Sequence, residues 1–177
     1  VSIVGGKLTT YRRMAQDTVD LLQRRDGRKL QHPTTNLPLL GSAGWIDTYN
    51  EFTQQASIYG LDASIIEHLS RTYGNEIREI FRLLTEDPTL ATRLIADLPS
   101  IRAQVVYACR AEMAMTPYDV LARRTSILLE DCQRGLGIVA LVADLMAHEL
   151  GWSPEQRVQL VEEYRQVVRR QMESERL

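Results

Sequence analysis

The sequence predicts an all-α fold of seven to eight helices, preceded by one strand and a glycine turn. Two observations carry this prediction. Apolar residues recur at three- and four-residue spacing through most of the chain, and helix-start and helix-stop residues punctuate it. The one apolar run suited to a strand is Val1 to Val4. With no partner strand in the sequence, its backbone groups lack hydrogen-bond partners. We therefore expect the chain to be a piece of something larger.

The chain divides into three parts by periodicity and punctuation. Gly5 and Gly6 follow the apolar run, and helical spacing then continues to about residue 25. From there to residue 44 the periodicity stops, while glycines and prolines recur. We predict a strand, glycine turn and helix over residues 1–25, a linker over 26–44, and a helical domain over 45–177.

Acidic caps and glycines mark the first helices of the helical domain. Asp47 is expected to cap a helix that ends near Gly60, and Asp62 to cap another that ends at Gly74. The next helix stops before Pro88.

Two later helices share one start signal. Thr116-Pro117 and Ser153-Pro154 each place a hydroxyl at the cap and a proline at the first helical position, where its missing amide costs nothing. The Thr116 hydroxyl is expected to accept from the third backbone amide, and Asp119 to favour the positive end of the helix.

Apolar stripes predict two buried helices, from Ile101 to Met113 and from Ile138 to a glycine cap at Gly151. The tail from Glu162 to Arg176 alternates charges and is expected to be a solvated helix. Contact of its arginines with an anionic surface is the alternative.

Composition excludes several classes of function. The 21 Lys and Arg residues, against 23 Asp and Glu, are spread along the chain, which argues against nucleic acid as a partner. The longest apolar run falls well short of the ~20 residues that cross a bilayer. Cys109 and Cys132 lack metal-ligand spacing, and His32, His68 and His148 are isolated, so we assign no metal site.

A glycine turn holds the most informative residues, Gly5-Gly6-Lys7-Leu8-Thr9-Thr10-Tyr11-Arg12. Amides at the start of a helix can point at an anion. The run is not a Walker loop, because Leu8 follows Lys7, and it is not a G-x-G-x-x-G fingerprint. By itself the turn fits either an anion site or an ordinary strand-to-helix turn capped by Thr9 or Thr10.

Residues 1–12 closely resemble the segment that closes the flavin domain in FAD-dependent glycerol-3-phosphate dehydrogenases. The resemblance covers most of the chain and continues through Leu37-Pro38-Leu39 with Gly41, Arg71-Thr72-Tyr73-Gly74, and Met115 to Thr125. It implies that the strand and glycine turn close an FAD-binding domain missing from this chain. It also implies that the residues from about 45 onward form the helical C-terminal cap domain of that family.

The resemblance implies a reaction and its partners. Hydride leaves C2 of glycerol 3-phosphate for flavin N5, giving dihydroxyacetone phosphate, and electrons pass to quinone. FAD and substrate are expected to require the missing N-terminal domain, because the dinucleotide fingerprint and the family's upstream arginines are absent here. The fragment alone is therefore expected to be inactive. The whole enzyme is expected in the cytoplasm, with possible peripheral attachment to the inner face of the membrane and possible homodimerisation.

The resemblance also implies roles for the turn. Gly6, Lys7, Leu8, Thr9 and Thr10 are expected to bind the cofactor, with the helix-start amides favouring the negative charge of reduced flavin. Lys7 adds a full positive charge, either beside the flavin ring or toward the substrate phosphate. We assign no catalytic residue in this chain.

Four arginines could have either a structural role or a role at the site. Arg12 and Arg13 lie one turn into the first helix and rank below Lys7 as site residues. Arg123 and Arg124, near Asp119, are expected to join an ion-pair network that includes Glu112, with closure over the substrate entrance as the alternative.

Two other functions compete with the dehydrogenase. A glycerol-3-phosphate oxidase, which passes electrons to oxygen, is the close second within the family, because nothing in this part of the sequence separates quinone from oxygen as the acceptor. A stand-alone helical interaction module accounts for the helices but leaves the strand at Val1 to Val4 unexplained.

Overall fold

The computed structural model describes residues 2–28 and 31–175. The chain divides into two compact units, Val1–Leu39 and Leu40–Leu177, which we describe separately. The described residues form helices and no strand, apart from one isolated bridge between Arg93 and Ile101. The predicted all-α class is therefore confirmed. None of the described helices is long and apolar enough to span a membrane.

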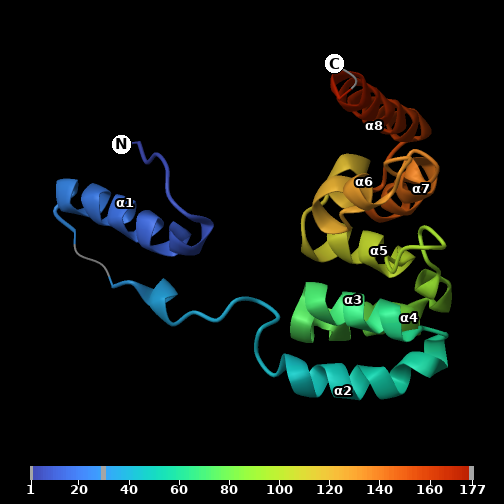
Figure 1. Ribbon diagram of the computed structural model, residues 1–177, viewed down its shortest axis with the longest axis horizontal. Coiled ribbons are helices and arrows are strands. Elements are labelled where there is room, and N and C mark those ends of the chain that lie inside the picture. The colour runs from blue at the N-terminus through green and yellow to red at the C-terminus, as the bar shows by residue number, and fades with distance from the viewer. Residues whose placement is uncertain (1, 29–30, 176–177) are drawn as a thin grey trace. The chain divides into compact units, whose positions relative to one another are not determined.

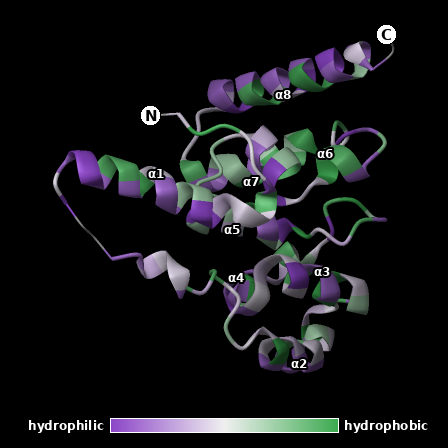
Figure 2. Cartoon of the chain, turned by 60° about the vertical axis from the view of Figure 1, so that its left-hand side comes forward, coloured by the Kyte–Doolittle hydropathy of each residue, from purple (hydrophilic) through white to green (hydrophobic). Residues whose placement is uncertain are grey.

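The first unit is built around one helix. A short 3-10 helix, η1 (Leu8–Thr10), leads into α1 (Tyr11–Arg25), and a second one, η2 (Pro33–Thr35), follows. The strand predicted over the first four residues does not form at residues 2–4, because no neighbouring strand is available to pair with them. Val1 lies outside the described residues. Figure 2 shows hydrophobic residues along α1, yet none of its residues is buried.

The second unit is a stack of seven α-helices (Figure 1). Three 3-10 helices and one π-helical turn connect them. The α-helices are α2 (Trp45–Gln55), α3 (Ala63–Tyr73), α4 (Ile77–Glu86), α5 (Arg102–Ala111), α6 (Ile127–Glu130), α7 (Val139–Leu150) and α8 (Pro154–Ser174). The connecting turns are η3 (Ala56–Tyr59), η4 (Gly74–Glu76), η5 (Pro88–Ala91) and the π-helical η6 (Asp119–Arg124).

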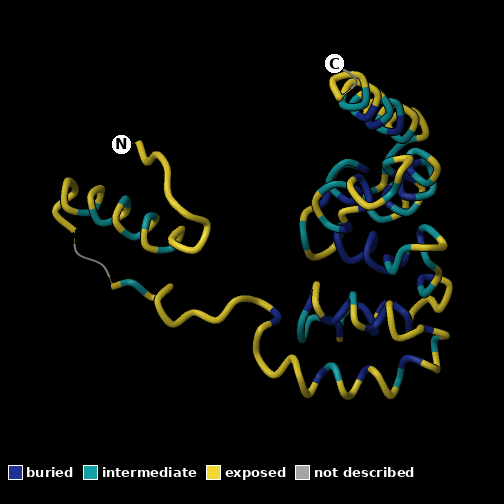
Figure 3. The backbone as a smooth tube through the Cα atoms, viewed as in Figure 1, coloured by how far each residue is buried: buried dark blue, intermediate teal, exposed yellow. Residues whose placement is uncertain are grey.

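The hydrophobic core of this unit has two clusters that share α5. Ala103, Val106 and Tyr107 face the first cluster, which α2, α3 and α4 complete. Val105 and Ala108 face the second, which α6, α7 and α8 complete. Figure 3 shows the buried positions concentrated on these helices, in contrast to α1. α5 is therefore the central helix of the domain.

Most of the predicted caps are present. The Asp62 carboxylate accepts from the Ser64 amide at 2.9 Å. The Ser153 hydroxyl accepts from the Gln156 amide at 3.2 Å, and the Gln156 side chain accepts in return from the Ser153 amide at 2.9 Å. Gly151 ends α7 in the left-handed conformation. These contacts explain why the boundaries of α3, α7 and α8 could be predicted.

One helix start and one helix type differ from the prediction. α2 begins at Trp45, after Gly44 with φ of +64°, so Asp47 lies in the first turn and is not the cap. The Thr116 hydroxyl does accept from the Asp119 amide, at 3.2 Å. The helix that follows is a π-helical turn, because the Thr125 amide donates to the carbonyl of Val120, five residues back, at 2.9 Å.

The predicted helix of the charged tail is α8, but it is solvated on one face only. On α8, Arg165 and Arg169 both approach Glu162, at 3.8 Å and 3.5 Å. Tyr164 and Val168 on the opposite face are buried in the second cluster. Arg176 lies outside the described residues.

Candidate functional site

The glycine turn before η1 has a backbone conformation that favours glycine. Gly5 has φ of +78° and Gly6 has φ of +111°, a region that residues with a side chain rarely adopt. Residues 2–11 are all exposed. The turn therefore presents its backbone on the surface of the first unit.

The helix start leaves two amides for a ligand. The Thr10 amide donates to the Lys7 carbonyl at 2.9 Å, and the Thr10 hydroxyl donates to the same oxygen at 2.8 Å. Thr10 is thus engaged within the turn, and no hydroxyl caps η1 or α1. The amides of Leu8 and Thr9 precede any acceptor in the helix, so they are the donors that the turn offers to an anion.

Lys7 differs from the two arginines that follow it. Among the described residues, nothing forms a hydrogen bond or ion pair with its exposed ammonium group. Arg12 donates to the Gln16 side chain at 3.1 Å, and Arg13 pairs with Asp17 at 3.0 Å. The Lys7 charge is therefore available to a ligand, while both arginines have partners within α1.

The geometry fits an anionic ring system such as reduced flavin. Two helix-start amides, the positive end of α1 and the Lys7 ammonium lie within five consecutive residues. Each favours negative charge. The space beside Gly5 is open, whereas the Met14 side chain lies against Gly6. The chain's contribution to such a site is electrostatic, with no proton donor or acceptor among residues 5–10 beyond Lys7 and the two threonines.

A groove of 520 Å³ lies within the first unit, between α1 and residues 31–39. Its wall includes Arg12, whose guanidinium donates to the Thr35 hydroxyl at 3.3 Å. His32, expected to be isolated, lies 3.2 Å from Asp20 on α1. These contacts hold the segment after α1 against the helix.

The segment from Met115 to Thr125 forms the predicted ion-pair network. Arg123 pairs with Asp119 and lies 5.1 Å from the centre of the Tyr118 ring. Arg124 lies 3.2 Å from the Glu112 carboxylate and donates to the Glu112 carbonyl at 2.8 Å. Arg123 therefore makes its contacts within the π-helical region, and Arg124 connects that region to the end of α5.

A close backbone contact joins two segments that carry the resemblance. The Asn75 amide donates to the Gly41 carbonyl at 2.8 Å, and the Asn75 side chain donates to the Ala43 carbonyl at 2.8 Å. A Cβ added at Gly74 would lie 2.0 Å from the Gly41 oxygen. Sequence analysis missed this contact, although a glycine in each segment was the available signal.

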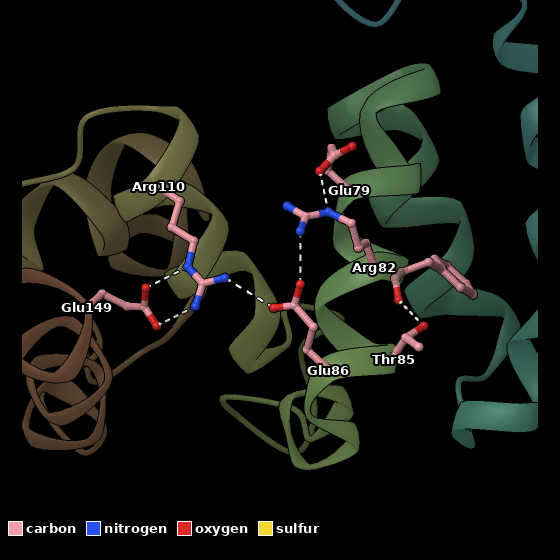
Figure 4. A network of polar contacts seen from close by, with 7 residues as sticks. Glu79, Arg82, Thr85, Glu86, Arg110 and Glu149 are labelled. Atoms are coloured by element: carbon pink, nitrogen blue, oxygen red, sulfur yellow. Dashed lines mark hydrogen bonds and ion pairs between the residues drawn. The ribbon is translucent and has the colours of Figure 1, made fainter.

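A polar network ties α4, α5 and α7 together (Figure 4). Arg110 on α5 donates to both carboxylate oxygens of Glu149 on α7, at 2.6 Å and 3.0 Å. It also donates to Glu86 on α4 at 3.3 Å, and Arg82 donates to Glu86 at 2.9 Å and to Glu79 at 2.9 Å. Sequence analysis did not identify this network, which crosses three helices.

The remaining histidines differ in burial. His148 is exposed and lies 3.5 Å from Glu149, whereas His68 is half-buried against Gln104 and Ser100. No group of three or more potential metal ligands occurs among residues 2–28 and 31–175.

Known proteins resemble the chain over most of its length. A family model described as the C-terminal domain of alpha-glycerophosphate oxidase matches residues 32–157. Glycerol-3-phosphate dehydrogenase of Synechocystis sp. is 33% identical over 172 residues, covering 93% of this chain and 30% of that protein. The mitochondrial glycerol-3-phosphate dehydrogenase of Mus musculus is 32% identical over 158 residues, covering 86% of this chain and 21% of that protein.

A solved structure agrees with these matches. The crystal structure of glycerol-3-phosphate dehydrogenase from Bacillus halodurans, complexed with FAD, aligns with a TM-score of 0.77 and 28% identity. The alignment covers 94% of this chain and 34% of that one. The chain thus spans about a third or less of the length of the relatives described here, and the resemblance drawn from the sequence is confirmed. Because the family model matches well over half of the residues, the chain belongs to the family of the C-terminal domain of alpha-glycerophosphate oxidase.

Proposed function

We propose that this chain is the C-terminal part of an FAD-dependent glycerol-3-phosphate dehydrogenase. The whole enzyme oxidises sn-glycerol 3-phosphate to dihydroxyacetone phosphate and passes the electrons to quinone. In this proposal residues 1–25 close the FAD-binding domain, residues 26–44 are a linker, and residues 45–177 are the helical cap domain.

The observation that carries the proposal is that no described residue of the first unit is buried, although the relatives of this chain are longer proteins. Leu8 is 88% exposed, and Val19 and Leu22 on α1 are 44% and 46% exposed. Burial of apolar surface contributes about 25 cal/mol per Å², so a helix with this pattern is stabilised by covering its apolar residues. An FAD-binding domain of the same polypeptide would supply that cover. A stand-alone interaction module could also use an exposed apolar helix, but it gives no reason for the glycine turn before it.

The turn supplies electrostatic stabilisation in this proposal. FAD, when bound, would supply the hydride acceptor, and its reduced ring would carry negative charge. The amides of Leu8 and Thr9 and the positive end of α1 favour that charge without reorganising, since the helix already orients them. Gly6 supplies the positive φ that the turn requires, and Thr10 fixes the turn through its two hydrogen bonds to the Lys7 carbonyl.

Lys7 has two placements that predict different kinetics. A positive charge at the substrate phosphate lowers KM for glycerol 3-phosphate and discriminates against glycerol. A positive charge beside the flavin raises its reduction potential and leaves discrimination unchanged.

Quinone as the acceptor implies that the whole enzyme approaches a membrane surface. We propose a cytoplasmic enzyme that attaches peripherally, with homodimerisation as a further feature to be measured. The curated relatives described above are named dehydrogenases, whereas the family model is named for an oxidase, so the electron acceptor needs a direct test.

The test uses the native polypeptide, recovered with an antibody raised against residues 45–175. We expect a visible flavin spectrum that bleaches anaerobically on addition of glycerol 3-phosphate and recovers faster with a short-chain quinone than with oxygen. Faster recovery with oxygen would identify an oxidase. A colourless protein would contradict the proposed function, and so would a flavin spectrum that does not bleach when glycerol 3-phosphate is added.

A further inference from the structure

A buried polar cluster lies where α3 meets the first turn of α5. Gln104 is completely buried at the start of α5. His68 and Tyr73 contact it from α3. Ser100, in the segment before α5, contacts His68. Because α5 serves both hydrophobic clusters, this contact connects α3 to the central helix of the domain.

Hydrogen-bond counting fixes the orientation of the Gln104 amide. Its Oε1 accepts from the Ile101 amide at 3.0 Å, an interaction that satisfies the start of α5. Its Nε2 therefore faces the Tyr73 hydroxyl at 3.1 Å and the Nε2 atom of His68 at 3.2 Å. An amide nitrogen carries two donors and no acceptor, so both partners must accept.

His68 must then be neutral. Its Nε2 accepts from Gln104, which leaves the ring proton on Nδ1. A protonated ring would direct an N–H group at the N–H₂ group of Gln104. Reversing the Gln104 amide would remove that conflict, but it would take the acceptor away from the Ile101 amide. The Ser100 hydroxyl, 3.5 Å from the same ring atom, is the other polar group there.

The charges around His68 do little to offset this conflict. Glu130 on α6 favours the protonated ring through space. On α3 itself, Glu67 is paired with Arg71 at 2.6 Å. On α5, Gln104 is uncharged, and burial is the largest influence on the ring, lowering the pKa of His68 below its ordinary value of 6.5.

We propose that His68 is a proton-sensitive lock between α3 and α5, closed when the ring is neutral and released when it is protonated. Release breaks the hydrogen bond with Gln104 and loosens the Tyr73 end of α3. Tyr73 precedes Gly74, whose backbone contacts Gly41, so the release extends to the attachment of the segment before α2. This inference does not depend on the proposed enzyme activity.

The sign of the pH dependence follows from the lowered pKa. The unfolded chain takes up the His68 proton at a higher pH than the folded chain does. The stabilisation is therefore fully present above the unfolded value of about 6.5 and is lost as pH falls from there toward the folded pKa.

The first experiment identifies the tautomer in the wild-type chain. Nitrogen-15 chemical shifts of the imidazole rings are recorded at pH 8 and followed to pH 5. We expect the His68 proton on Nδ1 at pH 8, and a shift of the Gln104 side-chain amide that follows the titration of His68. A proton on Nε2 at pH 8, or a Gln104 side-chain amide shift that does not change as His68 titrates, would contradict the proposal.

The second experiment separates the lock from simple packing. In His68→Gln the new side-chain oxygen can still accept from Gln104 but cannot titrate. His148→Gln removes an exposed histidine as the matched control. From pH 7.5 to 5.5, the unfolding constant of the wild type and of the control should rise relative to that of His68→Gln, by at most tenfold per pH unit. Parallel pH profiles in all three proteins would refute the proposal, and a His68→Gln variant that fails to fold leaves the decision to the tautomer measurement.

Discussion

At position 74 only glycine fits, because any Cβ would collide with the backbone of Gly41. Its φ of +57° and ψ of −128° lie in a region that residues with a Cβ rarely adopt, and the Gly41 carbonyl fills the space beside it. We predict that Gly74→Ala lowers the free energy of unfolding by about 2 kcal/mol or more. Gly60→Ala is the control, because Gly60 has φ of +67° with nothing within 4 Å of the added Cβ, and it should cost about 1 kcal/mol. Equal losses for the two variants in urea unfolding would show that the contact with Gly41 does not matter.

The site residues at this scale were only partly predictable. The sequence indicates the glycine turn and Lys7 as candidates, because glycines and a lysine at a helix start have a local chemical meaning, and their role as site residues stays a prediction. It could not show that the Thr10 amide is used within the turn, or that His68 accepts from Gln104. Such contacts depend on where a helix start or a distant helix places each atom.

At the scale of single elements, the start of α8 depends on one hydroxyl. Ser153 and Gln156 satisfy each other's backbone amides at the helix start. We predict that Ser153→Ala destabilises the chain by about 1 kcal/mol in urea unfolding. Ser57→Ala is the control, since Ser57 is exposed and makes no side-chain hydrogen bond within the described residues. An effect of Ser153→Ala no larger than that of the control would contradict the capping role.

The ion pair of Arg110 with Glu149 connects α5 and α7. Its paired geometry and the burial of Glu149 predict a coupling energy of about 1 kcal/mol in a double-mutant cycle with Arg110→Met and Glu149→Gln. The exposed pair of Glu67 and Arg71 on α3 should give about 0.3 kcal/mol in the same measurement. A coupling energy for Arg110 and Glu149 no larger than this would contradict the prediction.

This ion pair also has a predicted pH dependence. The hydrogen bond from Arg110 lowers the pKa of Glu149 below its ordinary value of 4.5. The stabilisation is therefore present above pH 4.5 and is lost as pH falls through the folded pKa. Raising the salt concentration at pH 7 should reduce the coupling, because the guanidinium is partly exposed.

Helix boundaries were predictable where a local signal sets them. Asp62, Ser153 and Gly151 act within one turn of their own position, so the sequence is sufficient to place them. α2 begins at Trp45, before the position that Asp47 predicted. The turn into the helix is made at Gly44, which has a positive φ. The π-helical turn at residues 119–124 also escaped prediction, since its apolar spacing resembles that of an ordinary helix.

For the whole molecule, the division at residues 39 and 40 predicts independent folding of the second unit. Both hydrophobic clusters lie beyond residue 40, and α1 contributes no buried residue. A chain of residues 40–177 should therefore unfold cooperatively, at the same urea midpoint as the full chain within about 0.3 M. A lower midpoint, or loss of cooperativity, would show that residues 1–39 stabilise the helical domain.

The fold class was predictable because helical periodicity and caps repeat along the chain. The order in which the helices stack was not predictable, because it depends on which apolar faces meet around α5. The predicted strand illustrates a different limit. An apolar run has strand propensity, but hydrogen bonds to a neighbouring strand are needed before a strand exists.

The central claim is that the turn of this chain forms part of a flavin and substrate site. Its most direct test is the rate at which glycerol 3-phosphate bleaches the flavin of the native polypeptide carrying Lys7→Met, measured anaerobically by stopped flow. The control is Arg13→Met, in which an exposed charge paired with Asp17 is removed from the same helix. The account predicts retained flavin with a second-order bleaching rate about 10- to 100-fold lower in Lys7→Met, as expected for the loss of one charged contact, and an unchanged rate in the control. Wild-type bleaching in Lys7→Met would contradict it.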